Sequence, residues 1–244
     1  MTVKRKKKRE YAKELKIERG VFDEYTLLHL YKLLEKTRIM AESLVKEGKE
    51  SVILAGRREK NGWVAIKIYR IKACDFKSMW KYLVNDQRFI RLRRNRRFIV
   101  NTWCQREYRN LKLASTAGID CPKPIAFNEN ILIMSFIGEE GIPAPMLINA
   151  DIPNPKKVYE RVVESMKKLA KVGLVHGDLS PYNILFMGKP FFIDFSHGTM
   201  LRNIFALELL KRDVENINSY FSKLNVPVKE SNTLYEELIS LIRK

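Results

Sequence analysis

The sequence predicts an α+β fold of two lobes, with an antiparallel sheet and a helix in the N-terminal lobe and mainly helices in the C-terminal lobe. Apolar strand-like runs separated by short turns occupy residues 44–69 and 124–137 of the 244-residue chain. Apolar residues at helical spacing instead mark three later segments, 158–169, 206–221 and 234–242. A hairpin pattern lies between the first two of these segments, at residues 183–193.

Changes in composition along the chain divide it into three predicted parts. Residues 1–20 form a basic flexible arm, in which the run from Lys4 to Arg9 either binds nucleic acid or stays a solvated tail. Residues 21–137 form the N-terminal lobe, which begins with a core-packing helix and carries a basic insert at residues 70–100. Residues 138–244 form the C-terminal lobe.

The composition indicates a basic intracellular protein. The formal net charge is +18, which favours a polyanionic partner such as RNA, DNA, an acidic surface or nucleotide phosphates. Cys74, Cys104 and Cys121 are too widely spaced for a zinc or disulfide framework, so we expect reduced thiols and a cytoplasmic location. The longest apolar run, Ile131–Ile137, is too short to span a bilayer, so no membrane partner is expected.

Three oxygen-bearing side chains flank the predicted hairpin. Asp178 precedes the first strand, Asn183 begins it, and Asp194 follows the second strand after the turn Met187–Lys189. We expect the three to converge, because a hairpin brings its two ends together. Alone, each has an ordinary reading as a turn cap, a loop amide or a strand end. Together they suit Mg²⁺, a cation that takes carboxylates, amides and phosphate oxygens.

The order of these residues resembles the catalytic loop of protein kinases. An H-x-D-x-x-x-x-N string runs from His176 to Asn183, and a D-F-x triplet begins eleven residues later at Asp194. The resemblance implies that Asp178 accepts the proton of an attacking hydroxyl or orients an attacking water. It also implies that Asn183 and Asp194 hold the metal that bridges the nucleotide phosphates.

Two departures from the common kinase pattern predict a trimmed fold. Gly177 stands where most kinases have the Arg that pairs with a phosphorylated activation loop. Only about ten residues separate Ser196 from the next helical pattern at Ala206, so there is no room for an activation loop or a peptide-binding subdomain. We therefore expect a kinase-like site that is not switched by loop phosphorylation and does not bind extended peptides.

The N-terminal lobe supplies the candidate nucleotide contacts. The turn around Lys49 and Ser51 lies where kinases cover the phosphates, although an ordinary charged turn has the same pattern. The strand Trp63–Tyr69 contains V-A-I-K, whose Lys67 would contact the α- and β-phosphates and pair with Glu107 on a later helix.

A strand at Ile131–Gly138 would end in the hinge of a bilobal kinase. Main-chain groups near Ser135 and Ile137 would then hydrogen-bond adenine, with the side chain of Met134 guarding the pocket behind.

Arginines are concentrated in the insert between Lys67 and Glu107. They alternate with apolar and aromatic residues, and they are Arg88, Arg91, Arg93, Arg94, Arg96 and Arg97. Arginine makes bidentate phosphate contacts and aromatic rings stack on bases, so this segment is either a surface for RNA or a phosphoprotein, or a mobile solvated loop.

Taken together, these residues resemble the RIO kinase family, specifically its type 1 branch, from about Leu44 to Phe221. The signatures include Ala65–Tyr69, the Arg-rich insert, Glu107–Leu111, Thr116–Ile119, Met134–Gly138, Pro143–Pro145, His176–Asn183 and Ile193–Ser196. Two positions of the catalytic loop differ from the family pattern, because Gly177 replaces Ala and Pro181 replaces Glu. The turn Lys46–Ser51 keeps Gly-Lys-Glu but lacks the family's preceding Ser-Thr.

The resemblance implies ATP and Mg²⁺ (or Mn²⁺) as cofactors, with serine autophosphorylation or ATP hydrolysis as the reaction. It further implies a role in maturation of the small ribosomal subunit, with rRNA contacting the basic insert. In some family members the metal-binding Asp is itself phosphorylated, and Asp194 has that position here.

Three other readings share the catalytic string. A small-molecule kinase of the aminoglycoside or choline type would have an acidic pocket, whereas this chain is strongly basic. The kinase associated with tRNA threonylcarbamoyl modification lacks the Arg-rich insert. The third reading is a nucleotide-sensing RNA-binding assembly factor, in which phosphoryl transfer to a substrate is incidental.

Overall fold

The computed structural model describes residues 22–58 and 62–242, which group into two compact units. Within these residues, unit 1 comprises the chain up to Trp80 together with Arg93–Gln105 and Pro124–Pro143. Unit 2 comprises Lys81–Leu92, Arg106–Lys123 and the chain from Ala144 onward. The basic arm 1–20 lies outside the described residues, and the three-part division of the chain stays a prediction.

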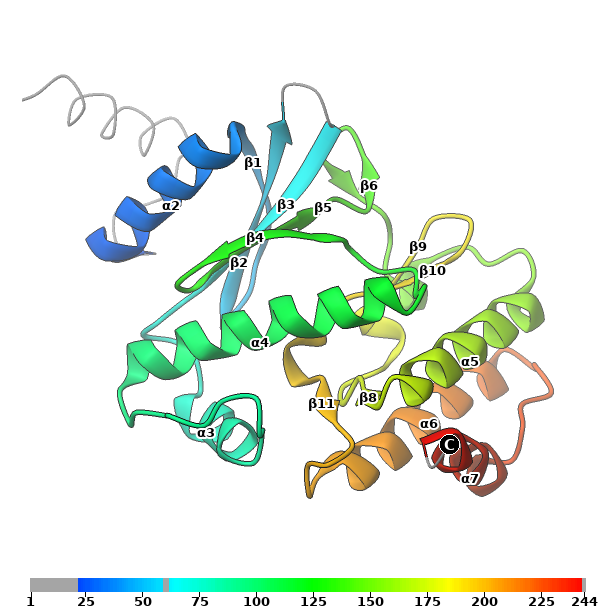
Figure 1. The fold of residues 1–244 in the computed structure, drawn as a ribbon. Helices are drawn as coiled ribbons and strands as arrows, with labels where there is room; N and C mark the ends of the chain where they lie inside the picture. Colours follow the sequence, from blue (N-terminus) through cyan, green and yellow to red (C-terminus); the bar gives the residue numbers. More distant parts are fainter. Residues whose placement is uncertain (1–21, 59–61, 243–244) are drawn as a thin grey trace, which may run out of the picture. The chain divides into compact units, whose positions relative to one another are not determined.

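Unit 1 is built on a five-stranded antiparallel sheet (Figure 1), as predicted for the N-terminal lobe. In chain order its strands are β1 (Ile39–Glu47), β2 (Ser51–Arg58), β3 (Gly62–Tyr69), β4 (Pro124–Asn128) and β5 (Ile131–Ser135). Their spatial order is β1-β2-β3-β5-β4, with β3 in the centre. The strand that carries Lys67 is therefore hydrogen-bonded on both sides.

Helix α2 (Glu24–Thr37) packs on one face of this sheet. Asp23 caps the helix by accepting a hydrogen bond from the Thr26 amide at 2.7 Å. The core between helix and sheet consists of apolar residues at helical spacing on α2 and at alternate positions on the strands: Leu30, Leu33, Leu34, Val52, Leu54, Val64, Ile66, Ile68, Ile131 and Ile133. The predicted alternation of β3 is confirmed, since Val64, Ile66 and Ile68 all face α2.

The predicted strand Ile131–Gly138 is shorter in the structure. β5 ends at Ser135, and the amide of Phe136 still donates to the carbonyl of Trp63 at 3.3 Å. The chain then enters a small hairpin of β6 (Gly138–Glu139) and β7 (Ile142–Pro143). Its turn residue Gly141 has a φ of 80°, and a Cβ there would lie 2.8 Å from the ring of Trp63, so this turn needs glycine.

The basic insert contains one helix and the start of a second. It contains α3 (Phe76–Val84), and its last residues open α4 (Arg96–Thr116), whose first half belongs to unit 1 and second half to unit 2. Of the two alternatives left open for the arginine-rich segment, the loop does not describe Arg96 and Arg97, which lie in the first turn of α4.

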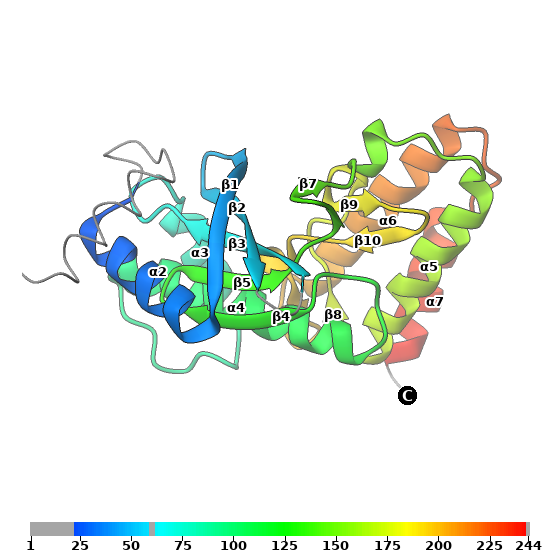
Figure 2. The same ribbon diagram turned by 90° about the horizontal axis from the view of Figure 1, so that it is seen from above.

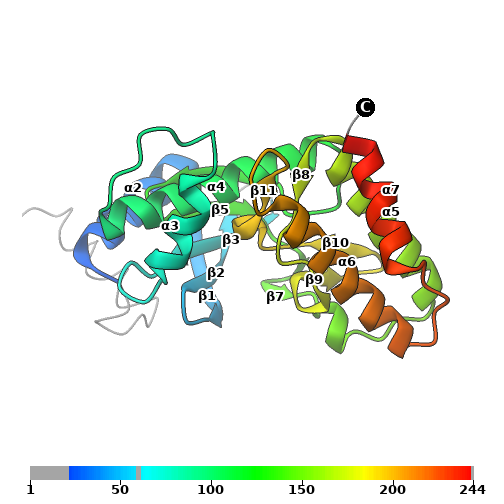
Figure 3. The same cartoon turned by 90° about the horizontal axis from the view of Figure 1, so that it is seen from below.

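Unit 2 contains the three C-terminal helices and several very short strands (Figures 2 and 3). The helices are α5 (Pro155–Lys171), α6 (Ala206–Lys223) and α7 (Ser231–Ile242). The shorter elements are the 3-10 helices η1 (Leu147–Asn149), η2 (Pro181–Asn183) and η3 (Phe195–His197), and the strand pairs β8 (Leu174–Val175) with β11 (Thr199–Met200) and β9 (Ile184–Phe186) with β10 (Pro190–Phe192).

Local sequence explains the helices of unit 2. Asn154 accepts a hydrogen bond from the Lys157 amide, and Pro155 occupies the first helical position of α5. The predicted apolar stripe of α5 faces inward, with Val158, Val162 and Met166 buried. Residues 198–205 alone separate η3 from α6, which agrees with the predicted lack of an activation loop.

Within the described ranges, no helix has both the length and the apolar character that crossing a lipid bilayer requires.

Candidate active site

A tight hairpin in unit 2 lies beside Asp178 and Asp194, which were predicted to be catalytic, and Asn183, which was predicted to bind metal with Asp194. β9 and β10 pair in antiparallel register from Ile184–Phe192 to Phe186–Pro190, as predicted. The amide of Ile193 extends this pairing by donating to the carbonyl of Asn183 at 3.0 Å. Asp194 follows immediately, so its backbone begins beside Asn183.

Asp178 and Asn183 are in direct contact. Nδ2 of Asn183 donates to the main-chain carbonyl of Asp178 at 2.7 Å and to its carboxylate Oδ2 at 2.9 Å. The amide therefore orients the carboxylate of Asp178 and fixes the turn that carries it. Asp194 has a left-handed backbone with φ 60° and ψ 64°, which is unusual for a residue with a side chain and typical of a functional turn.

The oxygen donors present at this hairpin fit a magnesium ion. Because Nδ2 of Asn183 makes both of its hydrogen bonds to Asp178, Oδ1 of Asn183 remains as an acceptor, next to the carboxylate-bearing Asp194. No cluster of three or more His, Cys, Asp or Glu side chains suited to a metal occurs among residues 22–58 and 62–242. An amide, one carboxylate and nucleotide phosphates are the ligands expected for Mg²⁺, which binds few protein groups.

A buried carboxylate that was not predicted from the sequence, Asp213, fixes the backbone of the catalytic loop. Asp213, on α6, accepts hydrogen bonds from the amides of Gly177 and Leu179, both at 2.8 Å. Arg212 donates to the carbonyl of Gly177 at 2.6 Å. Burial raises the pKa of Asp213 to about 7, although both amide donors act to lower it. A fully buried Asp within the apolar stripe of α6 was the available signal, because such a group needs partners.

Gly177 allows this loop to approach the segment after Asp194. Its φ is 80°, and a Cβ at this position would lie 2.7 Å from the carbonyl oxygen of His197. The departure from the common kinase pattern at Gly177 therefore has a steric reason in this chain.

His176 links the catalytic loop to the hairpin. Its Nε2 lies 3.0 Å from the carbonyl oxygen of Ile193, and its ring packs 4.7 Å from that of Phe195. Complete burial lowers the pKa of His176 to about 4, so the ring is neutral at pH 7 and donates through Nε2–H. His176 is thus a structural anchor for the residue that precedes Asp194.

Lys67 lies in unit 1 on the sheet face opposite α2. Its side chain is buried, with Nζ 5.0 Å from the centre of the Tyr69 ring. Cross-strand partners share a face, and the register pairs Lys67 with Ile53 and Leu132, and Ala65 with Met134. Ser51 pairs with Tyr69 on the same face, at the end of the strands nearest the β1–β2 turn.

The β1–β2 turn contains Lys49 at an exposed tip, and the amide of Gly48 donates to the carbonyl of Ser51 at 2.9 Å. Arg70, just after β3, donates to the carbonyl of Gly48 at 3.2 Å and lies 3.4 Å from the carboxylate of Glu47. Arg70 was not anticipated as a partner of this turn.

The predicted hinge residues follow β5. Ser135 is the last residue of that strand, and Ile137 lies between β5 and β6. The binding of adenine by main-chain groups at Ser135 and Ile137 stays a prediction. Glu107 is fully buried on α4, in the half that belongs to unit 2, and its pairing with Lys67 stays a prediction.

Comparison with known proteins identifies the family. The family model described as the RIO domain matches residues 52–234 of this chain. The chain belongs to the RIO family.

Named relatives assign this RIO chain to the Rio1 branch. It is 41% identical over 223 residues to the RIO-type serine/threonine-protein kinase Rio1 of Methanocaldococcus jannaschii, covering 90% of this chain and 76% of the relative. It is 36% identical over 227 residues to Rio1 of Haloferax volcanii, covering 92% of this chain and 78% of the relative. These similarities show a RIO1-type atypical kinase.

A solved structure shows the same fold. The crystal structure of the Rio2 kinase–ADP/Mg²⁺–phosphoaspartate complex from Chaetomium thermophilum has a TM-score of 0.67 at 22% identity, covering 89% of this chain and 66% of that one. The predicted trimmed kinase-like α+β fold is confirmed.

The arginines of the RIO chain's basic insert fall into two groups. Three of them are tied down: Arg88 to Asp86 at 2.7 Å, Arg96 to the carbonyl of Lys72 at 3.0 Å, and Arg97 to Asp23 at 2.6 Å. Arg91, Arg93 and Arg94 are exposed, and the guanidinium of Arg94 lies 5.3 Å from the centre of the Trp80 ring. The sequence could not separate Arg96 and Arg97 from the exposed arginines, because the partners of these two lie 24 and 74 residues away along the chain.

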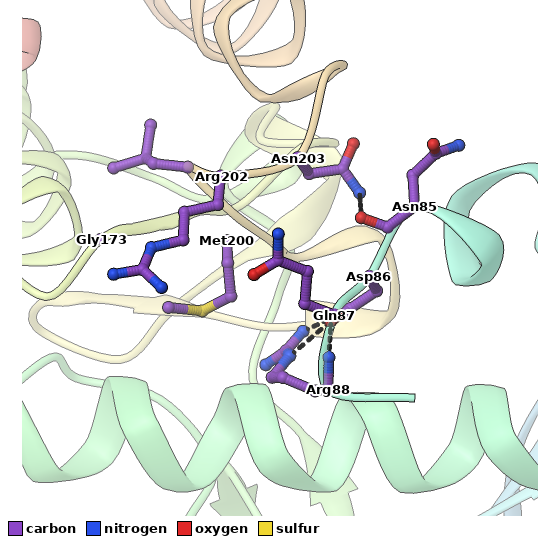
Figure 4. Close-up of a pocket in the computed structure, with 9 residues that line it drawn as sticks. Asn85, Asp86, Gln87, Arg88, Gly173, Met200, Arg202 and Asn203 are labelled. Carbon is purple, nitrogen blue, oxygen red and sulfur yellow. Dashed lines mark hydrogen bonds and ion pairs between the residues drawn. The ribbon is translucent and has the colours of Figure 1, made fainter. Parts of the chain in front are cut away.

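A cavity of about 420 Å³ in unit 2 was also not anticipated (Figure 4). One wall is the insert segment Asn85–Arg88, and the other is Met200–Asn203, which follows β11. The side-chain amide of Asn203 donates to the carbonyl of Asn85 at 3.1 Å and joins the two walls.

Proposed function

We propose that this RIO kinase transfers the γ-phosphoryl group of ATP to a serine or threonine hydroxyl, including one of its own, or to water. The observation that supports this most directly is the contact of Asn183 with Asp178 at the end of the hairpin that leads into Asp194. A proton acceptor and two metal-binding groups are the parts that phosphoryl transfer requires from this side of a nucleotide.

The remaining predicted residues have complementary roles in the proposal. Lys67, with Glu107 as its partner, would neutralise the α- and β-phosphates, and Lys49 and Ser51 would contribute to phosphate binding from the β1–β2 turn. Main-chain groups at Ser135 and Ile137 would bind adenine. Asn183 and Asp194 would hold Mg²⁺ (or Mn²⁺), which supplies Lewis-acid neutralisation of the phosphate charge when bound.

Asp178 would act as the base or as the group that orients water. The amide of Asn183 aims its carboxylate, and the loop that carries it is fixed by Asp213. Asp194 also has the position whose phosphorylation would give an aspartyl-phosphate. The Rio2 complex from Chaetomium thermophilum contains ADP, Mg²⁺ and phosphoaspartate, which supports these cofactors and that intermediate for the present chain.

The ATPase reading has a specific observation in its favour. Only residues 198–205 lie between η3 and α6, so a subdomain that grips peptides is missing from this position. Without that subdomain, a kinase has no grip on an extended peptide, so water or a docked assembly is an equally suitable acceptor of the phosphoryl group.

We further propose that the polyanionic partner is RNA of the small ribosomal subunit during its maturation, in the cytoplasm. The exposed Arg91, Arg93 and Arg94 and the net charge of +18 support an RNA contact. The three cysteines are buried and form no disulfide with one another, which suits a reducing compartment.

The test separates chemistry from binding. For Asp178→Ala we expect phosphate release and protein phosphorylation both to fall by about 10²- to 10⁴-fold, the usual contribution of a positioned base. Binding of a non-hydrolysable ATP analogue should change by less than about threefold, since Asp178 is assigned to the transition state. Equal loss of binding and chemistry would contradict the assigned role.

The matched control is Asp151→Ala, which removes an exposed loop carboxylate from the same unit and should leave both quantities unchanged. Running both assays with and without small-subunit particles distinguishes a kinase from an ATPase: particle-stimulated phosphate release without protein phosphorylation indicates the ATPase.

A further inference from the structure

The amide of Asn110 bridges both ends of the segment that follows Asp194. Asn110 is fully buried on α4, and its Nδ2 donates to the carbonyl of Phe195 at 2.8 Å and to that of Gly198 at 2.6 Å. These two carbonyls belong to the first residue of η3 and to the residue that ends it. One side chain therefore fixes the peptide planes on either side of the turn that begins at Asp194.

The segment has no room for a different arrangement. A Cβ at Gly198 would lie 2.7 Å from Nδ2 of Asn110 and 2.9 Å from the carbonyl oxygen of Phe195. Neither neighbour can retreat easily, because one is a buried amide and the other is backbone. Gly198 is thus the residue that lets Asn110 approach.

Arg88 of the basic insert holds Asn110 in its working orientation. Nη1 of Arg88 donates to Oδ1 of Asn110 at 2.7 Å, which leaves Nδ2 pointing at the two carbonyls. With this bond, every polar atom of the Asn110 amide is used. A flipped amide would put Nδ2 against a guanidinium and Oδ1 against two carbonyl oxygens, so the orientation is fixed by repulsion as well as attraction.

Asp86 fixes Arg88 in turn. The two side chains form a bidentate pair, with Nε to Oδ1 at 2.8 Å and Nη2 to Oδ2 at 2.7 Å. Arg109, one residue before Asn110, donates to the carbonyl of Arg88 at 3.1 Å. Figure 4 shows Asp86 and Arg88 at the wall of the cavity beside Met200.

We propose that Asn110, oriented by the Asp86–Arg88 pair of the insert, is a positioning residue for the metal-binding Asp194. The inference rests on the proposed function, and it adds a second task for the basic insert besides any contact with RNA. The left-handed backbone at Asp194 needs support from its surroundings, and the bond from Asn110 to the Phe195 carbonyl fixes the peptide bond one residue beyond it. A carboxylate held in one place binds a metal more tightly than one that samples several.

The test measures metal binding directly, with Mn²⁺ as the probe. Free Mn²⁺ is followed by electron paramagnetic resonance in the presence of a saturating non-hydrolysable ATP analogue. For Arg88→Met and Asn110→Asp we expect the Mn²⁺ dissociation constant to rise about tenfold, the lower end for loss of a group that orients a metal ligand. Affinity for the analogue without metal should stay within about twofold.

Arg88→Lys keeps the charge but cannot bond Asp86 and Asn110 with the same geometry. It should therefore bind Mn²⁺ more tightly than Arg88→Met and less tightly than the wild type. Lys77→Met removes one positive charge from an exposed position of the same insert and should bind Mn²⁺ like the wild type. Hydrogen exchange supplies a second readout. The Gly198 amide is bonded to the Phe195 carbonyl at 3.0 Å, and it should exchange faster only in Arg88→Met and Asn110→Asp.

The outcomes are separable. Unchanged Mn²⁺ affinity in folded Arg88→Met and Asn110→Asp overturns the positioning role, whereas a wild type that binds no Mn²⁺ with the analogue overturns the proposed function itself. Arg88→Met should fold, because Arg106 still lies 3.3 Å from the carboxylate of Asp86. It therefore decides the question if Asn110→Asp does not fold.

Discussion

Two buried ionisable residues, His176 in the catalytic loop and Asp213 beneath it on α6, respond to pH in opposite directions. Burial raises the pKa of Asp213 to about 7 from an ordinary value of 3.8, and it lowers the pKa of His176 to about 4 from 6.5. Between pH 4 and 6.5, Asp213 carries a proton only in the folded chain, and His176 carries one only in the unfolded chain. Their contributions to the pH dependence of folding therefore cancel in this interval.

Replacing either residue should leave the contribution of the other to the pH dependence of unfolding visible. In Asp213→Asn only His176 remains, so the free energy of unfolding should rise by about 1.4 kcal/mol per pH unit from pH 4 to 6.5. In His176→Phe only Asp213 remains, whose stabilising contribution is complete below pH 4 and is lost as pH rises through 7. The slope should then have the opposite sign. Urea unfolding at several pH values measures both.

The wild type should show a much flatter profile than either variant over the same interval. Parallel profiles for the wild type and Asp213→Asn would show that Asp213 stays ionised in the folded chain despite its burial. That result would mean that the two amide bonds from Gly177 and Leu179 outweigh desolvation.

At the scale of single elements, the β1–β2 turn is held by the segment that follows β3. Arg70 contacts Gly48 and Glu47, its amide donates to the carbonyl of Glu50 at 2.8 Å, and the amide of Asp75 donates to the carboxylate of Glu50 at 3.2 Å. A turn fixed at three points has little freedom to lose when a ligand binds. Such preorganisation favours binding of phosphates to its backbone.

Arg70→Met should therefore weaken ATP binding and leave adenosine binding unchanged, because only the phosphates lie under the turn in the proposed function. We expect a loss of about three- to tenfold in ATP affinity, measured by calorimetry, which corresponds to about 0.6–1.4 kcal/mol, the net free energy of one ordinary hydrogen bond. Lys72→Met, which removes an exposed cation from the same segment, is the control. An equal loss for adenosine would place the effect on the fold rather than on the turn.

The basic insert has arginines of two kinds: those proposed to contact RNA, and those bonded to other parts of the chain. Replacing Arg91, Arg93 and Arg94 together by Gln should weaken association with single-stranded RNA and lower the slope of log affinity against log salt by about 0.7 for each lost phosphate contact. Filter binding at several salt concentrations measures this. Unchanged affinity and slope would exclude these three arginines from RNA contact.

The arginines bonded to other parts of the chain should respond differently. Arg97→Gln removes an ion pair with the cap of α2 and a ring contact with Tyr25 at 4.5 Å, so it should lower thermal stability with little effect on the salt slope. A cluster mutant that spans residues 91–97 would mix both effects.

At the scale of the whole molecule, the residues proposed to bind the nucleotide belong to different units. Lys67 belongs to unit 1 and Asp194 to unit 2. If both bind one nucleotide, Mg²⁺ with an ATP analogue at about a hundred times its dissociation constant stabilises the chain by about 2.7 kcal/mol. For a chain of this size that is a rise of about 5–10 °C in melting temperature.

Lys67→Met and Asp194→Asn should each abolish most of this rise, while the apo melting temperatures change by smaller amounts. Scanning calorimetry with and without the analogue measures both quantities. A full rise in either variant would remove that residue from the nucleotide site.

Local patterns in the sequence were sufficient for much of the site. The spacing of Asp178, Asn183 and Asp194 predicted the hairpin and the contact at its end, because hairpin geometry depends on only a few consecutive residues. The alternation in β3 predicted which side of the sheet Lys67 faces. The strand through Gly138 was predicted too long, since apolar continuity does not reveal where a chain leaves a sheet.

The sequence by itself therefore indicated the fold class and the residues suited to phosphoryl transfer through short-range periodicity and spacing, and it indicated the family through the resemblance of its motifs. Only the tertiary structure revealed the supports of that chemistry. Asp213 reaches the catalytic loop across 36 residues, and Asn110 reaches Phe195 across 85. Hydrogen bonds of that range leave no periodic signal, because each depends on one side chain meeting one carbonyl or amide after the chain has folded.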